Sequence, residues 1–152
     1  MSSYTMPNVY KFDAAKRRQG ADLHLTKEYE SDPHKTIIDF IAPFISKIQL
    51  ASSKILVATY RRPEISKGGI IMAGSNLDED KWQGVAALVL KLGSAAFVDD
   101  ATTTFSGFHA KQYDWVTFRP SVGVAREFNG LHCRIVEDKM IDAVIDDPTL
   151  VW

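Results

Sequence analysis

From residue 48 onward the chain is a series of short aliphatic runs separated by turn-forming residues, and this punctuation limits the folds available to it. The runs, each rich in β-branched or aromatic side chains, are residues 48–57, 85–92, 115–118 and 133–136. The turn signals between them are Gly68-Gly69, Gly93, Arg119-Pro120, Gly123 and Asn129-Gly130. Short runs bounded by glycine and proline are typical of strands joined by turns. The pattern therefore predicts an all-β fold, a small and partly open β-barrel with long loops.

The rest of the chain is expected to be an N-terminal extension. With 152 residues, 45% of them hydrophobic, the chain suits one core, so we assign residues 48–152 to the barrel and residues 1–47 to an arm with a short helix. Residues 1–35 show no hydrophobic period and are expected to form no core of their own. Their basic run, Lys16-Arg17-Arg18, is interpreted as a solvated face rather than a nucleic-acid contact.

A helix is predicted directly after Asp32, because an aspartate cap followed by Pro33 is a favoured helix start. Pro43 is expected to end or kink this helix near Ala42, since proline has no N–H to donate. One stripe at helical spacing carries the apolar residues Ile37, Ile38, Phe40, Ile41, Phe44 and Ile45. Two interpretations of this stripe are open: it packs on the barrel of its own chain, or it docks on a neighbouring subunit or a larger assembly.

Two connections are unusually long for a small β-domain. Residues 60–83 carry the apolar triplet Ile70-Ile71-Met72 near their middle, after Gly68-Gly69. Residues 94–112 carry three phenylalanines among small and polar residues, and are predicted to form a hairpin or flap that projects from the barrel. Residues 137–145 are ambiguous, because their apolar spacing fits a helix and their β-branched character fits a strand.

No motif in the sequence predicts an enzyme, a cofactor or a metal site. His132 and Cys133 could suggest a base beside a thiolate, but neighbours on a strand point to opposite faces, so Cys133 is expected to be a buried structural residue. The pairs Asp99-Asp100 and Asp146-Asp147 are expected to be solvated loop charges. Because Cys133 is the only cysteine, no intrachain disulfide is expected.

The net charge and hydropathy also limit which partners the protein is expected to bind and in which compartment it is expected to lie. A formal charge of −1 gives no net attraction to nucleic acid or to anionic membranes. No segment approaches the roughly 18 to 20 apolar residues of a membrane span, and the first thirty residues are too polar for a signal peptide. We therefore expect a cytoplasmic protein that does not bind membranes.

Several segments, in order, resemble the GroES-type co-chaperonins over residues 48–146. Residues 48–57 resemble the first strand of that family, and Ser66-Lys67-Gly68-Gly69-Ile70-Ile71-Met72 resembles the tip of its mobile loop. Asp114-Trp115-Val116-Thr117-Phe118 is similar to the strand after its roof hairpin, although Tyr113 stands where the family commonly has glycine. The extension before Ile48 has no counterpart in the family. These departures indicate a divergent member, such as those carried by bacteriophages.

The resemblance implies a ring of subunits that caps a GroEL-type chaperonin and assists protein folding. The residues that it implies for partner binding are Gly68, Gly69, Ile70, Ile71 and Met72. The alternative for these residues is an ordinary hairpin turn that enters a core strand. In the family the closing strand pairs with the first strand of the next subunit, which implies contacts through Ile48, Leu50, Ile55, Val57, Ile141, Val144 and Ile145. The alternative is a phage virion structural or capsid-decoration protein built on the same barrel, located in the virion and not only in the host cytoplasm.

Overall fold

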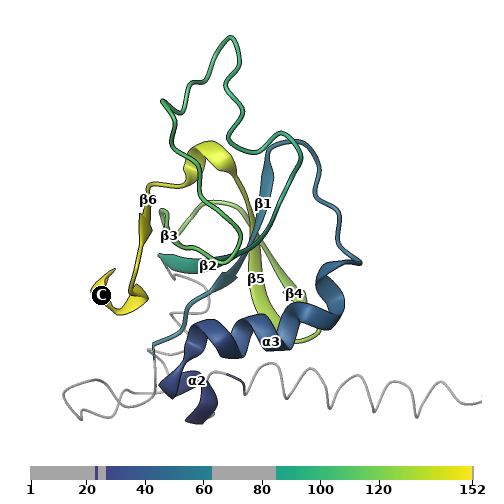
Figure 1. The fold of residues 1–152 in the computed structure, drawn as a ribbon, viewed down its shortest axis with the longest axis vertical. Helices are drawn as coiled ribbons and strands as arrows, with labels where there is room; N and C mark the ends of the chain where they lie inside the picture. Colours follow the sequence, from purple (N-terminus) through teal and green to yellow (C-terminus); the bar gives the residue numbers. More distant parts are fainter. Residues whose placement is uncertain (1–22, 24–26, 63–84, 152) are drawn as a thin grey trace, which may run out of the picture.

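The computed structural model describes residue 23, residues 27–62 and residues 85–151. Its helices are α2 (Lys27–Ser31) and α3 (Pro33–Ile45), with short 3₁₀ helices η2 (Asp138–Met140) and η3 (Pro148–Val151). Its strands are β1 (Lys54–Thr59), β2 (Ala86–Leu92), β3 (Trp115–Thr117), β4 (Val124–Phe128), β5 (Leu131–Glu137) and β6 (Ala143–Ile145). These strands form one antiparallel sheet in the order β4-β5-β1-β2-β3-β6 (Figure 1). The described part of the chain is therefore mostly β, and its six-stranded sheet is not closed.

Three of the predicted strand runs are confirmed as β2, β3 and β5. The first run is only partly a strand, because β1 begins at Lys54, whereas Ile48 and Leu50 lie in the link after α3. β4 was not predicted, and it pairs with β5 through the expected turn at Asn129-Gly130. Asn129 and Gly130 both have positive φ angles, 54° and 89°, as a two-residue hairpin turn with the twist of the sheet requires.

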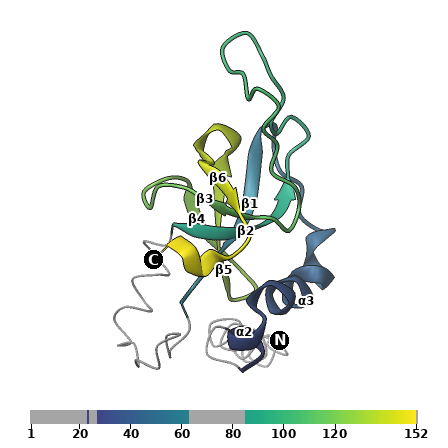
Figure 2. The ribbon, with the colours of Figure 1, turned by 60° about the vertical axis from the view of Figure 1, so that its left-hand side comes forward.

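The central strands are buried on both faces, which explains their continuous apolar sequences. On one face Leu56, Leu88 and Leu90 pack with α2 and α3. On the other face Val57 and Val89 pack with the connection between β2 and β3, and with Ile141, which lies between η2 and β6. The helices lie at one end of the molecule and the β2–β3 connection projects at the other (Figures 1 and 2).

The predicted helix is confirmed as α3, and its cap is the expected one: Asp32 accepts a 3.0 Å hydrogen bond from the N–H of Lys35. Ile37 and Ile41 have no exposed surface and belong to the core under the sheet, so the apolar stripe packs on its own chain. Pro43 is expected to end or kink the helix near Ala42. The helix does not end there, because α3 continues to Ile45. Pro43 is exposed, and water can hydrogen-bond the carbonyl that loses its N–H partner there.

Residues 1–35 are predicted to form no core of their own, and one of their described residues, Tyr29, belongs to the core of the sheet. This residue of α2 is 1% exposed and belongs to the same apolar cluster as Leu56 and Leu88 of the sheet. The helical segment from Lys27 onward is thus packed into the fold, although a single tyrosine in a polar stretch gives no periodic signal.

The β2–β3 connection projects as predicted but forms no hairpin, because no strand lies between Leu92 and Trp115. Phe97 is buried and makes edge-to-face contacts with Phe105 and Phe108, at centroid distances of 5.3 and 5.7 Å. The ambiguous residues 137–145 contain both kinds of structure, the short helix η2 and the strand β6. Among the described helices, none is long and apolar enough to cross a membrane.

Candidate functional site

The long connection that contains the predicted partner-binding residues begins and ends at two adjacent, buried strands. Thr59, the last residue of β1, pairs with Ala87 of β2. The N–H of Tyr60 donates to the carbonyl oxygen of Ala86 at 2.9 Å, and the N–H of Phe118 donates to that of Val85 at 3.0 Å. The two ends of the connection, at Tyr60 and Val85, are called its roots below. Both are held by main-chain hydrogen bonds. The predicted binding residues Gly68, Gly69, Ile70, Ile71 and Met72 lie outside the described residues.

The N-terminal helices contribute directly to the first root. The hydroxyl of Tyr29 donates a 2.9 Å hydrogen bond to the carbonyl oxygen of Arg61 and accepts a 3.0 Å hydrogen bond from the N–H of Arg61. The Tyr29 ring stacks on the Tyr60 ring at 6.2 Å, and Tyr60 meets Trp115 edge to face at 5.6 Å. Sequence reasoning missed Tyr29 and Arg61, because nothing local connects residues 32 positions apart.

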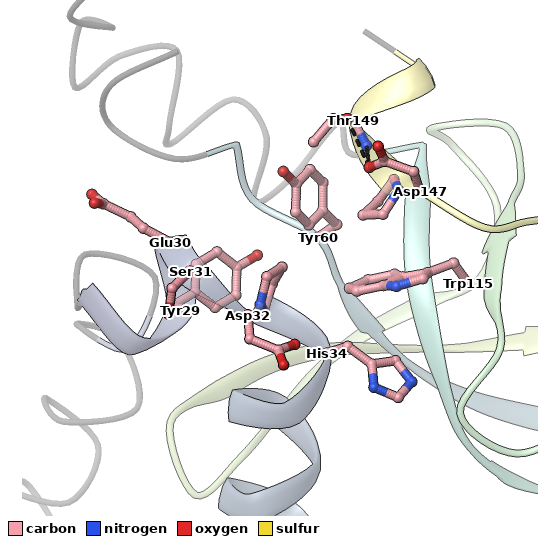
Figure 3. A pocket seen from close by; sticks show the side chains of 11 residues that line it. Tyr29, Glu30, Ser31, Asp32, His34, Tyr60, Trp115, Asp147 and Thr149 are labelled. Carbon is pink, nitrogen blue, oxygen red and sulfur yellow. Dashed lines mark hydrogen bonds between the residues drawn. The ribbon is translucent and has the colours of Figure 1, made fainter. Parts of the chain in front are cut away.

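A cavity of about 410 Å³ lies beside this aromatic group (Figure 3). It is lined by Tyr29, Glu30, Ser31, Asp32, Pro33, His34, Tyr60, Trp115, Asp147, Pro148 and Thr149. Two of its carboxylates cap local turns, since Asp32 accepts from the N–H of Lys35 and Asp147 accepts from the N–H and hydroxyl of Thr149. Nε2 of His34 lies 2.9 Å from the carbonyl oxygen of Tyr113, to which it donates. Asp32, Asp147 and His34 are thus engaged in hydrogen bonds to the main chain around the cavity.

The predicted subunit-interface residues fall into two groups. Ile55 and Val57 have no exposed surface, and β1 is paired with β2 on one side and β5 on the other. These two side chains belong to the interior of one chain, because β1 is a central strand and not an edge. Ile48 and Leu50 are half-buried against the core that contains α3, and so contribute to it.

The closing segment is placed differently, because β6 is an edge of the sheet. β6 pairs with β3 along one side and has no strand on its other side within the described residues. Val144 is 41% exposed on this edge, Ile145 is half-buried and Ile141 is buried. A contact between copies through these residues stays a prediction.

The structure places His132 and Cys133 as expected for a strand. Cys133 lies in the core with no exposed surface, and burial raises the pKa of its thiol far above the ordinary range. A thiol that stays protonated and has no access to solvent is no nucleophile.

The aspartate pairs serve the loops that carry them. Asp100 accepts hydrogen bonds from the N–H groups of Thr102 and Thr103, and these bonds lower the pKa of its carboxyl. Asp99 accepts from the N–H of Phe105. Within the described ranges, no three histidine, cysteine, aspartate or glutamate side chains are grouped so that they could hold a metal ion.

Comparison with models of known protein families gives no match, and comparison with curated protein sequences gives none.

Proposed function

We propose that this chain is a co-chaperonin subunit of the GroES type, in which a partly open barrel presents residues Gly68–Met72 to a chaperonin ring. The observation that carries the proposal is the position of the connection. A stretch from Tyr60 to Val85, with the triplet Ile70-Ile71-Met72 inside it, is inserted between two adjacent strands whose ends are hydrogen-bonded to each other. Binding residues lie disproportionately often on the connections between strands and helices.

The chemistry of the triplet suits docking in an apolar groove of a partner. Each of its side chains contributes about 1.5–3 kcal/mol when fully buried, whereas ordering each residue of the backbone costs about 1–2 kcal/mol. One such segment therefore binds weakly, and useful affinity requires several identical copies that act together. A ring of subunits supplies those copies.

Tyr113 gives independent support to the resemblance. It stands where the family commonly has glycine, and its φ angle is 70°, in the left-handed region that glycine adopts without strain. A backbone conformation that glycine adopts without strain thus occurs at the position where the family commonly has glycine.

The sheet also has the edges that a ring needs. β4 and β6 end the strand order, and an edge strand exposes N–H and C=O groups that another copy can pair with. Pairing of β6 with the next subunit's β4 is a head-to-tail contact, and such contacts close into rings when the rotation between subunits permits. We therefore propose that the ring contact uses β6 and not β1.

The test is to mix the purified full-length protein with a GroEL-type chaperonin and nucleotide, and to determine the native mass of the particles. A complex of a chaperonin with one or two rings of this protein, and assisted refolding of a client protein, is the expected result. A monomer that does not bind chaperonin would overturn the proposal. Copies found in purified virions, without chaperonin binding, would assign the barrel to a virion structural role.

A further inference from the structure

We infer that the hydroxyl of Tyr29 is a positioning group, which extends the fixed root of the β1–β2 connection by one residue and so prepares the connection for its partner. The effect on partner binding rests on the proposed function. The effect on the root itself does not, because it concerns only described residues.

Within the described residues, the ladder between β1 and β2 ends at Tyr60. In this part of the chain, its N–H makes the last main-chain hydrogen bond between the two strands, to the carbonyl oxygen of Ala86. The next residue, Arg61, belongs to no strand. Both of its main-chain polar groups are instead satisfied by one side-chain oxygen, the Tyr29 hydroxyl, at 2.9 and 3.0 Å. Tyr29 thus gives both main-chain groups of Arg61 a partner just beyond the described end of the ladder.

Tyr29 is itself rigidly held, which is what a positioning group requires. Its side chain is 1% exposed, and its ring stacks on Tyr60 with an angle of 25° between the ring planes. Tyr60 in turn meets the ring of Trp115 on β3. The path from the sheet to the root therefore runs through Trp115, Tyr60 and Tyr29 to Arg61, and each step is a contact of packed rings or a hydrogen bond.

This arrangement gives the N-terminal extension a role in binding. A residue that is already fixed in the free protein loses no further conformational entropy when the partner binds, so binding is stronger. Because the ordering of one residue corresponds to about a tenfold change in affinity, loss of the Tyr29 hydroxyl should weaken chaperonin binding about tenfold for each connection. Several connections on one ring multiply this loss.

The test compares wild type with Tyr29→Phe, which keeps the ring and removes both hydrogen bonds. Ser31→Ala is the matched control, because Ser31 also donates from a hydroxyl to a main-chain oxygen, but to that of Glu28 within α2 and not to Arg61. Amide hydrogen exchange resolved by residue is measured in all three proteins. In Tyr29→Phe the Arg61 amide should exchange at least tenfold faster, while the core amides of Leu56 and Leu88 keep their rates. In the control, all three amides should stay as in wild type.

Chaperonin binding of the same three proteins gives the second measurement, with about a tenfold or larger loss expected for Tyr29→Phe only. An Arg61 amide that is unprotected in wild type would overturn the inference before any variant is made. An equal rise in exchange at Leu56, Leu88 and Arg61 would show a purely structural role, and unchanged chaperonin binding with faster Arg61 exchange would remove the role in binding. If wild type binds no chaperonin, the proposed function fails, and the exchange comparison alone still decides whether Tyr29 positions the root.

Discussion

The Nζ atom of Lys91, on β2, donates a 2.9 Å hydrogen bond to the carbonyl oxygen of Ile45, the last residue of α3. The same ammonium group donates to the carbonyl oxygen of Ile48. Carbonyls at a helix end lack intrahelical partners, and a cation there also offsets the negative end of the helix dipole. Lys91, on a central strand, thus joins the C-terminal end of α3 to the sheet.

Replacement of this lysine should separate the helix end from the sheet. Lys91→Met keeps most of the aliphatic length and leaves two carbonyls without their charged donor, so the free energy of unfolding should fall by about 1.5–3 kcal/mol. Lys47→Met, at an exposed residue next to the same helix end, is the control and should change it by less than about 0.5 kcal/mol. Urea unfolding followed by circular dichroism measures both, and equal effects of the two variants would contradict the assignment.

Gly93 is required by the close approach of two backbone segments. A Cβ atom at this position would lie 2.2 Å from the carbonyl oxygen of Ser52 and 3.0 Å from that of Lys54. Since main-chain atoms cannot move away as a side chain can, Gly93→Ala should lower the free energy of unfolding by more than about 4 kcal/mol or prevent folding.

The control for that variant is Gly107→Ala. Gly107 has a φ angle of 86° but nothing within 4 Å of its added Cβ, so only backbone strain of about 1–2 kcal/mol is expected. Soluble expression and thermal unfolding measure both variants. A stable Gly93→Ala protein would show that the backbone near Ser52 can yield.

Glu137 should make the stability depend on pH in the acid range. Hydrogen bonds from Lys54 and from the hydroxyl of Ser53 lower the pKa of its carboxyl in the folded state. A lowered folded-state pKa means that the carboxylate adds stability above its ordinary pKa of about 4.3, and that this contribution is lost as the pH falls through the folded-state value. The contribution is small, because the pair is partly exposed to solvent.

The measurement is urea unfolding at pH 7 and at successive values below 4.5, for wild type and Glu137→Gln. The variant should be less stable than wild type at pH 7, and the difference should shrink as the solution becomes more acidic. A stability difference between wild type and Glu137→Gln that grows as the pH falls would contradict the prediction.

Ile71→Asp tests the docking triplet. A charge placed where an apolar side chain enters a groove should cost several kcal/mol for each connection, which abolishes binding when repeated over a ring. The protein should still fold and assemble. Asn76→Asp adds the same charge to the same connection outside the triplet, and should bind chaperonin as wild type does.

Chaperonin binding and client refolding are measured for both variants. An Ile71→Asp protein that folds and still supports refolding would remove the triplet from the mechanism. One that is insoluble while Asn76→Asp is soluble would indicate that Ile71 belongs to the core.

Local signals allowed much of the fold to be predicted from the sequence. The aliphatic runs became β2, β3, β5 and part of β1, Asp32-Pro33 began a helix, and Asn129-Gly130 formed a turn. Each of these depends on the conformational preference of a few adjacent residues, which is present in the sequence whatever the rest of the chain does. β4 has no such signal, because it lies at the edge with mostly exposed side chains and is held by main-chain bonds to β5.

Contacts between distant residues were decided only by the tertiary structure. The apolar character of Ile55 and Val57 is equally consistent with a core and with an interface, and only the pairing of β1 on both sides makes them core. Tyr29 is one aromatic residue in a polar segment, and its link to Arg61 joins residues 32 positions apart. Such burial and hydrogen bonding depend on how helices and strands pack in space. No local sequence pattern predicts that packing.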